Sequence, residues 1–328
     1  MSQKVYYIYP TYNPDKDTSG NLYIKYFTES FIENEDYVSN CNVKLGIISA
    51  FTNLKAEVFI FNWVDLIPYK RYGSIQTILF IFLLPLLWIL NKKLVWILHN
   101  KQSHYGPNYL VTKVMDLMAR FADVVIVHSQ EGVEFFNEKY AAKFGFKVRH
   151  IPHPVYSQKI HAHIDEKWDY IIWGGIGPHK KILEFLEYVE QSSFFRDKKI
   201  LICGQGQNEN YASKIMSKTN TNIHFINRFI TDKELKDLIS SSRSTLFTFS
   251  PDSVLSSGSL IYSLNFNRRI IGKNVGNFRD LKGIVNCYDT FDEIEKIDIS
   301  KPQNREAVCS YLEENTWNKF PNKLENFI

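Results

Sequence analysis

The sequence predicts an α/β fold of two doubly wound, Rossmann-like domains that face a central cleft, and three observations lead to it. Short apolar runs rich in β-branched and aromatic residues alternate with longer segments of helical period. The alternation occurs twice along the chain, and strands that alternate with helices indicate parallel sheets with crossover helices. The 328 residues are enough for roughly two domains, each with its own core.

The expected elements follow this alternation along the chain. Apolar runs are expected as strands at Val5–Tyr9, Val43–Ile48, Val58–Asn62, Leu94–Leu98, Val124–Val127, Val148–Ile151, Tyr170–Trp173, Lys199–Cys203, Ile223–Phe225, Thr245–Phe249, Arg269–Gly272 and Ile284–Asn286. Segments of helical period are expected as helices at Gly20–Glu33, Ser74–Leu90, Pro107–Phe121, Ser129–Tyr140, Lys180–Gln191, Asn208–Ser217, Asp232–Ser240, Ser257–Asn265 and Phe291–Ile297. Two prolines and mixed polar residues break the pattern at 152–167. We therefore expect domains at 1–155 and 156–328, and leave open whether the last helix packs back on the first domain.

The composition is that of a globular protein with a mild positive charge. Hydrophobic residues make up 45% and charged residues 23% of the chain. The net charge of +4 is too small to indicate nucleic acid as a partner, and it is compatible with anionic ligands or an anionic membrane surface. The four cysteines form no CxxC pair and no zinc spacing. Because the N-terminus also resembles a first strand and not a signal sequence, we expect a cytoplasmic protein.

Residues 77–90, TILFIFLLPLLWIL, form an unusually apolar segment. It is too short to cross a bilayer, since a spanning helix takes ~20 residues. Two basic residues precede it at 70 and 71, and two follow it at 92 and 93. Two interpretations stay open. Residues 77–93 can form a helix in the membrane interface, which places the protein peripherally on the inner face of the cell membrane, or a buried crossover helix.

A candidate phosphate site lies at residues 249–264, FSPDSVLSSGSLIYSL. A strand-like run ends there in a loop of small residues that opens into a helical segment, and such a junction directs unpaired N–H groups and the positive end of the helix dipole outward. No Asp or Glu occurs from 253 to 279, where four residues are basic. An ordinary strand-to-helix turn is the other interpretation. The residues expected to bind phosphate are Ser256, Ser257, Gly258 and Ser259.

A second candidate anion site follows the strand expected at 170–173, in the sequence YIIWGGIGPHKK. Gly175 belongs to a glycine-rich turn that lets a ligand approach the backbone. Lys180 stands where its ammonium group can reach a phosphate beside a helix start. Two convergent anion sites in one domain suit a nucleoside diphosphate.

Four segments, in the same order over almost the whole chain, resemble those of bacterial glycosyltransferases of the GT-B fold, the group 1-like enzymes of capsule and exopolysaccharide synthesis. Val95–His104 resembles the strand and His-Asn loop of their acceptor domain, and Ala122–Phe136 the strand and "HS" helix start that follow. Ile171–Glu187 resembles the opening strand, glycine-lysine turn and helix of their donor domain. Phe225–Leu264 resembles the block that holds the base and diphosphate of a sugar nucleotide.

The resemblance implies a metal-independent hexosyltransferase that needs no cofactor. The donor is expected to be a UDP- or GDP-sugar bound by the domain at 156–328. The acceptor is expected to be a glycan, lipid-linked, on the domain at 1–155, in the synthesis of capsule, exopolysaccharide or O-antigen. The diphosphate is the leaving group, and preorganised N–H groups with a lysine stabilise its charge without a metal ion.

Departures from the family pattern leave the stereochemical outcome open. Retaining members usually carry two glutamates separated by seven residues in the donor block. This chain has Asp252 and Ser253 near the first place and Leu260 or Ile261 near the second. The arginine usual after the first glycine of the donor turn is replaced by Gly175, while Lys180 matches the usual lysine. Arg228 is a further candidate for the phosphate charge.

One histidine and two aspartates are candidates for the general base that an acceptor hydroxyl needs. His99 follows a strand at the expected cleft edge, and histidine titrates near neutral pH. Asp15 and Asp17 are the alternatives, because they precede an expected strand–helix loop that contains Gly20 and faces the cleft. Gly20 and His104 are placed on the acceptor side. A loop histidine bonded to backbone is the other interpretation of both histidines, and the only DxD, at 15–17, is interpreted as solvated and not as a metal site.

Two other functions stay open. A sugar-nucleotide epimerase of the same fold also cleaves a bond to diphosphate, although it calls for carboxylates that residues 253–279 lack. A catalytically silent GT-B-like partner of a true transferase is favoured by the missing glutamate pair and the missing arginine.

Overall fold

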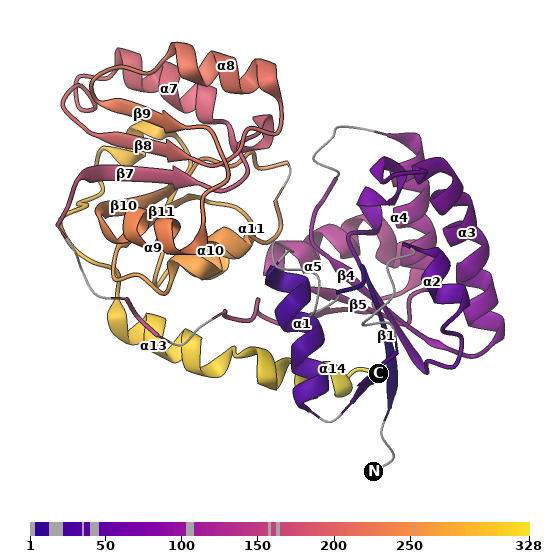
Figure 1. Ribbon diagram of the computed structural model, residues 1–328. Coiled ribbons are helices and arrows are strands. Elements are labelled where there is room, and N and C mark those ends of the chain that lie inside the picture. Colours follow the sequence, from indigo (N-terminus) through magenta and orange to yellow (C-terminus); the bar gives the residue numbers. More distant parts are fainter. Residues whose placement is uncertain are drawn as a thin grey trace. The chain divides into compact units, whose positions relative to one another are not determined.

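The computed structural model describes residues 4–12, 22–34, 36–39, 46–102, 108–156, 159–161, 165–252 and 254–328. The chain divides into two compact units, Met1–Tyr156 with Asn315–Ile328, and Ser157–Glu314. Each unit is built on a six-stranded sheet with helices on its faces (Figure 1), and every strand pairing is parallel. The predicted α/β fold of two doubly wound sheets is confirmed.

The sheet of the first unit has the strand order β2-β1-β3-β4-β5-β6. Its strands are β1 (Val5–Tyr9), β2 (Tyr37–Val38), β3 (Val58–Asn62), β4 (Lys93–Leu98), β5 (Val124–Val127) and β6 (Val148–His150). Both faces are covered, so the inner strands are continuous apolar runs, and all five residues of β3 are buried. The chain leaves β1 first toward β2 and then toward β3, which makes the carboxyl ends of β1 and β3 the switch point of this sheet.

Helices cover the first sheet on both faces. They are α1 (Leu22–Glu33), α2 (Ile48–Phe51), η1 (Val64–Tyr69), α3 (Gly73–Ile89), α4 (Tyr109–Phe121), α5 (Gln130–Phe136), the π-helical turn η2 (Asn137–Ala141), α6 (Ala142–Phe144), η4 (Trp317–Lys319) and α14 (Phe320–Glu325). The C-terminal helix α14 lies beside α1 (Figure 1), where the ring centroids of Phe27 and Phe320 are 5.1 Å apart. The C-terminus thereby completes the core of the first unit.

The apolar segment at 77–90 lies in α3, and its two faces differ. Thr77, Phe80, Leu83, Leu84 and Leu87 are buried in the unit. Residues on the opposite face are exposed, so a buried crossover helix accounts for only part of the sequence. Within the described ranges, no helix combines the length and apolar content that a bilayer crossing requires.

The sheet of the second unit has the order β12-β11-β10-β7-β8-β9. Its strands are β7 (Trp168–Trp173), β8 (Ile200–Cys203), β9 (Ile223–Ile226), β10 (Ser242–Phe247), β11 (Arg269–Lys273) and β12 (Asn286–Tyr288). Its helices are η3 (Pro178–Lys180), α7 (Ile182–Gln191), α8 (Glu209–Ser217), α9 (Asp232–Ser240), α10 (Gly258–Ser263), α11 (Gly276–Asp280), α12 (Phe291–Ile294) and α13 (Arg305–Glu314). The chain builds outward from β7 to β9 and then returns to β10, so the switch point lies between β7 and β10.

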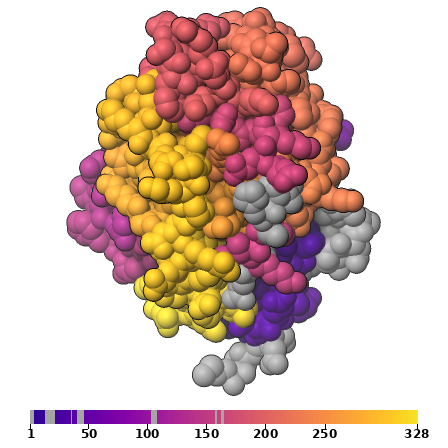
Figure 2. Space-filling view, turned by 90° about the vertical axis from the view of Figure 1, so that its left-hand side faces the viewer, coloured from indigo at the N-terminus to yellow at the C-terminus, as the bar shows by residue number. Residues whose placement is uncertain are grey.

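Helix α13 lies on the surface of the second unit, where it is yellow in Figure 2. Its buried residues Val308 and Leu312 are four apart and therefore share one face. The buried Gln303 anchors the segment before it, because its Nε2 donates to the carbonyls of Leu264 and Phe266 at 3.1 and 2.6 Å. One apolar stripe and one amide thus attach the helix to its unit.

Three expected strands are wrong in part, and the strand expected at 284–286 begins only at Asn286 and ends at Tyr288. Ile48, expected to end the strand at 43–48, begins helix α2, and residues 40–45 lie outside the described ranges. The strand expected at 245–249 begins at Ser242 and ends at Phe247. It ends early because the chain then bonds to the glycine-lysine turn: the Thr248 hydroxyl donates to the Lys180 carbonyl, and Ser250 N donates to the His179 carbonyl.

Candidate functional site

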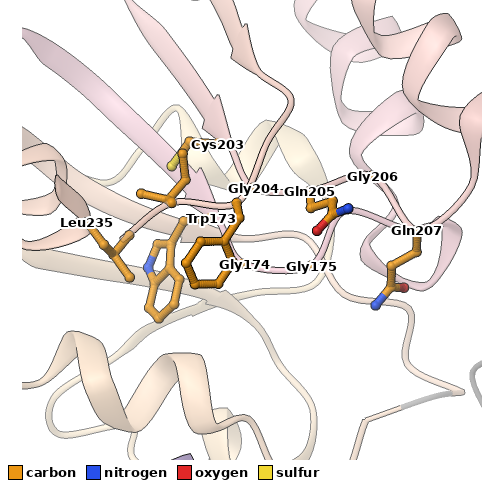
Figure 3. A pocket seen from close by; sticks show the side chains of 11 residues that line it. Trp173, Gly174, Gly175, Cys203, Gly204, Gln205, Gly206, Gln207 and Leu235 are labelled. Atoms are coloured by element: carbon orange, nitrogen blue, oxygen red, sulfur yellow. The ribbon is translucent and has the colours of Figure 1, made fainter. Parts of the chain in front are cut away.

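A pocket of about 480 Å³ opens beyond the carboxyl ends of β7, β8 and β9. This edge of a parallel sheet is where doubly wound proteins bind ligands. Figure 3 shows Trp173, Cys203 and Leu235 at one end of the pocket and the amides of Gln205 and Gln207 at the other. The lining residues are Trp173, Gly174, Gly175, Cys203, Gly204, Gln205, Gly206, Gln207, Phe229, Ile230 and Leu235.

The turns that follow β7 and β8 are bonded to each other, and this fixes the pocket wall. Gly174 N donates to the Cys203 carbonyl at 3.1 Å, and Ile176 N donates to the Gln205 carbonyl at 3.0 Å. Gly204 has φ +139°, and a Cβ built on it would lie 1.9 Å from the Gly174 oxygen. Only glycine fits there, because both the backbone angle and the space exclude a side chain.

Lys180 lies at the switch point between β7 and β10. Its Nζ donates to the carbonyl of Trp173, the last residue of β7, and lies 5.5 Å from the ring centroid of Phe249, which follows β10. Burial lowers the pKa of this ammonium group to about 8, and the neighbouring Cys203 opposes the shift. Among the described residues no carboxylate lies within 4.0 Å of Nζ. Lys180 is therefore a buried cation without an anionic partner in the described part of the second unit.

The ammonium group meets the pocket wall at Gly174. A Cβ built on this glycine would lie 3.0 Å from Lys180 Nζ and 3.4 Å from Ser259 Oγ. The ammonium group, the Ser259 hydroxyl and the backbone of the turn that contains Gly175 therefore converge on one place. Three of the residues predicted as donor ligands are brought together there.

The other predicted serines serve partly to hold the loop. Ser257 caps α10, since its Oγ accepts from Leu260 N at 3.2 Å, and its own N–H donates to Asn277 Oδ1 at 3.1 Å. Asn277 Nδ2 also donates to Ser256 Oγ at 3.4 Å. Gly258 is the first residue of α10. Of this group, Ser259 is the residue whose hydroxyl lies beside the pocket wall.

Arg228 lies on the loop between β9 and α9, in an ion pair with Glu234. Its two terminal nitrogens donate to the two carboxylate oxygens at 2.8 and 2.5 Å. The neighbouring Asn227 Oδ1 accepts from Gly206 N at 2.9 Å and ties this loop to the turn after β8. A contact between Arg228 and a phosphate stays a prediction, and the phosphate would have to compete with Glu234 for the guanidinium.

His99, the predicted general base, follows β4 in the first unit. Its Nε2 donates to Asn62 Oδ1 at 3.1 Å, Asn62 Nδ2 donates to the Tyr9 carbonyl at 3.1 Å, and the ring stacks on Trp63 with centroids 4.3 Å apart. Burial lowers the pKa of His99 to about 3, so the imidazole is neutral near pH 7. His99 was predicted as the base because histidine titrates near neutral pH, and this ring does not titrate there. Its Nδ1 still carries a lone pair.

Two more histidines join His99 around Tyr23. The Tyr23 hydroxyl donates to His128 Nε2 at 2.8 Å, because His128 Nδ1 donates to the Ile151 carbonyl at 2.8 Å. His153 lies 5.1 Å from His128 between ring centroids, and burial lowers its pKa to about 4. The histidine cluster, His99, His128 and His153, is therefore buried, aromatic in its surroundings and uncharged at neutral pH.

The remaining predicted residues were Asp15, Asp17, Gly20 and His104, and they lie outside the described ranges, so they stay predictions. Over the residues that the structure covers, no three His, Cys, Asp or Glu side chains are grouped so that they could hold a metal ion.

Sequence reasoning missed two parts of the site. The turn at 203–207, CGQGQ, follows a predicted strand directly and carried the same glycine signal as the turn at 174–177. Asn277, which fixes the loop at 256–257, had no signal in the sequence, because its partners come from a distant segment. The first miss was avoidable and the second was not.

Comparison with solved structures places this architecture among glycosyltransferases. HepE from Anabaena in complex with UDP-glucose is 10% identical, with a TM-score of 0.68 over 99% of this chain and 100% of that one. Sucrose-phosphate synthase from Thermosynechococcus elongatus is 10% identical, with a TM-score of 0.71 over 99% and 98%. AviGT4, a glycosyltransferase involved in avilamycin A biosynthesis, is 12% identical, with a TM-score of 0.61 over 99% and 96%.

No protein-family model matches the sequence, and no curated protein matches it. At 10–12% identity the structural likeness concerns the fold. The chain has the GT-B fold that its four motif-like segments predicted.

Proposed function

We propose that the protein is a glycosyltransferase whose second unit binds a UDP- or GDP-sugar and whose first unit receives the acceptor. One observation carries the proposal: Lys180 is a buried ammonium group without a carboxylate partner in the described structure, at the switch point of a sheet whose fold is shared with sugar-nucleotide enzymes. A buried charge is costly unless it is paired, and a diphosphate supplies the missing partner.

The reaction follows from this arrangement. The bond between the anomeric carbon and the β-phosphate oxygen breaks, and its electron pair stays on the phosphate. The acceptor oxygen bonds to the anomeric carbon and passes its proton to a base. Lys180, the Ser259 hydroxyl and the N–H of Gly175 stabilise the departing charge, and this demands no metal ion. His99 and Asp17 are the proposed residues for the acceptor proton.

We further propose a hexose donor and a lipid-linked glycan acceptor, as in the synthesis of capsule, exopolysaccharide or O-antigen. Solved HepE in complex with UDP-glucose supports a UDP-hexose as the first donor to test. The neutral, aromatic edge of the first unit suits an uncharged sugar, since sugar rings stack on aromatic faces and their hydroxyls bond to groups such as His99 Nδ1. Such an acceptor would place the enzyme at a membrane surface.

Isothermal titration calorimetry with UDP, GDP and UDP-glucose tests donor binding. We expect one diphosphate to bind the wild-type protein and Lys180→Met to weaken it about 100-fold, because the buried anion loses its charge partner. Lys181→Met is the matched control: the adjacent lysine is half exposed and pairs with Glu184 at 2.7 Å, so its affinity should stay within about twofold of the wild type.

Release of UDP from UDP-glucose separates the remaining functions. Slow hydrolysis that Lys180→Met abolishes supports a transferase. Tight binding without turnover, even with glycan acceptors, would indicate the silent partner. Conversion of the sugar to its epimer, without transfer to an acceptor, would indicate an epimerase. If neither UDP nor GDP binds at millimolar concentration, the proposal is wrong.

A further inference from the structure

Helix α3 carries an apolar stripe on its solvent face. Ile75, Ile78, Phe82 and Ile89 follow one another at helical spacing, and they are 57%, 54%, 66% and 71% exposed. The helix lies at the outer side of its unit (Figure 1), and the stripe is roughly 20 Å long at 1.5 Å per residue. Single exposed apolar residues are ordinary, but a continuous stripe of them marks an interaction surface.

Aromatic residues mark both ends of this stripe. Tyr72 precedes the helix and is 64% exposed, and Trp88 lies in its last turn and is 68% exposed. Tyrosine and tryptophan concentrate where an apolar phase meets water, because each has a large apolar ring and a polar group. The ends of the stripe therefore have the composition of a lipid–water boundary.

The charges around α3 are of one sign. No Asp or Glu occurs between Asp65 and Asp116, whereas Lys70 and Arg71 precede the helix and are exposed, and Lys92 follows it. Asp65 is buried, and the Asp116 carboxylate of α4 lies near the Tyr140 hydroxyl, whose pKa is raised first by burial and then by this carboxylate. Lys93 is discounted, since it lies 3.7 Å from Asp123. The surface around the stripe is thus basic.

We infer that this stripe, with Lys70 and Arg71, docks the first unit on an anionic lipid bilayer. Helix α3 lies flat in the headgroup region, with Ile78, Phe82 and Ile89 directed to the acyl chains. Charge complementarity selects this occupant: the basic residues attract acidic headgroups and repel a second copy of the same face. The lipid-linked acceptor rests on the proposed function, but the docking surface does not, and the two can fail separately.

Vesicle flotation of the full chain tests the docking. The wild-type protein should float with phosphatidylcholine vesicles that contain phosphatidylglycerol and bind about tenfold less without it. The α3 variant Ile78→Ser, Phe82→Ser, Ile89→Ser should lose flotation. The control variant Leu22→Ser, Ile32→Ser, Phe146→Ser removes three exposed apolar residues elsewhere on the unit and should keep it. UDP affinity should be the same in all three proteins, which separates docking from donor binding.

A second measurement covers the case in which the α3 variant does not fold. Trp88 fluorescence in the wild-type protein should be quenched by brominated lipid, and Trp88→Phe should lose that quenching. The inference is overturned if the wild-type protein ignores anionic vesicles or if the folded α3 variant floats equally well. It is also overturned if light scattering shows a dimer that only the α3 variant dissolves, since a second copy then covers the stripe.

Discussion

The two units differ in charge at the same edge of similar sheets. Both have a switch point at the carboxyl ends of their strands. In the second unit the edge is built from glycine turns and carries the buried ammonium group of Lys180, without a carboxylate partner among the described residues. In the first unit the edge is filled by the histidine cluster, which burial keeps neutral.

Under the proposed function, this difference lets one architecture bind a charged donor and an uncharged acceptor. A lysine that is desolvated and unpaired favours an anion, because the anion restores the lost interactions. The buried, neutral imidazoles of the first unit leave its edge without a positive charge that would favour an anion. The fold places the carboxyl ends of the strands at one edge of each sheet, and a few side chains determine the charge of that edge.

Acidification should destabilise the first unit most. The folded pKa values of His99 and His153 are about 3 and 4, against about 6.5 in the unfolded chain, and that of His128 is also lowered. The unfolded chain therefore binds more protons below pH 6.5, and stability falls as the pH falls, by about 1.4 kcal/mol per pH unit for each histidine. Between pH 7 and 5 the loss from the three histidines together should reach roughly 6 kcal/mol.

Hydrogen exchange with mass spectrometry at pH 5 and 7 can follow each unit separately. After correction for intrinsic rates, the β3 peptide in the first unit should lose protection, while the β7 peptide in the second unit should not, because the described histidines there (His161, His179 and His224) are not buried. His153→Phe should lower the pH slope of the first unit by about a third. Equal acid sensitivity of both units would refute the contrast.

Gly204→Ala should have the next largest effect, on the second unit. A methyl group at this position would lie 1.9 Å from the Gly174 oxygen at a φ of +139°, so the two turns have to separate. We expect a loss of about 3 kcal/mol or more, together with the loss of UDP binding. Gly283→Ala is the control, since its Cβ would meet no atom within 4 Å. Urea unfolding that shows similar stability for both variants would mean that the turns rearrange freely.

The pH dependence of UDP affinity should be smaller. Lys180 has a pKa of about 8 in the free protein, and a bound diphosphate favours its charged form. Affinity should therefore be level below pH 8 and fall as the lysine deprotonates, by about tenfold between pH 7 and 9. Calorimetry at both pH values measures it, and Lys180→Met should show weak binding without this slope. A level profile in the wild-type protein would mean that the ammonium group does not contact the diphosphate.

How much of this was predictable depended on the range of the interactions. Strand Val58–Asn62 and helix Asp232–Ser240 were predicted to the residue, because an uninterrupted apolar run and a threonine-capped helical period are local signals. Strand Tyr37–Val38 was missed, since two residues carry no periodicity. Lys180 was predicted from its spacing after a glycine turn, which is again local.

What the sequence could not show was which side chains are already engaged. Nothing in the local pattern indicates that Asn277 accepts a hydrogen bond from Ser257 N, because the two residues lie 20 positions apart in the sequence. The neutrality of His99 likewise depends on Asn62, Trp63 and Tyr23, which meet only in the folded unit. The sequence indicated which residue types could form the site. Their burial and their hydrogen-bond partners depend on tertiary packing, which the sequence does not show.

Arg228→Ala should have the smallest effect, and it tests where the positive charge of the second unit resides. The guanidinium is paired with Glu234 through two hydrogen bonds and is exposed, whereas Lys180 is buried and unpaired in the described structure. An exposed pair contributes little, so UDP affinity should change by less than about threefold. Glu234→Gln, which releases the guanidinium, should raise affinity if Arg228 can reach the phosphates. A loss of about tenfold or more in Arg228→Ala would mean that the arginine leaves Glu234 when the donor binds, and the anion site of the second unit would then depend on two cations and not on Lys180 alone.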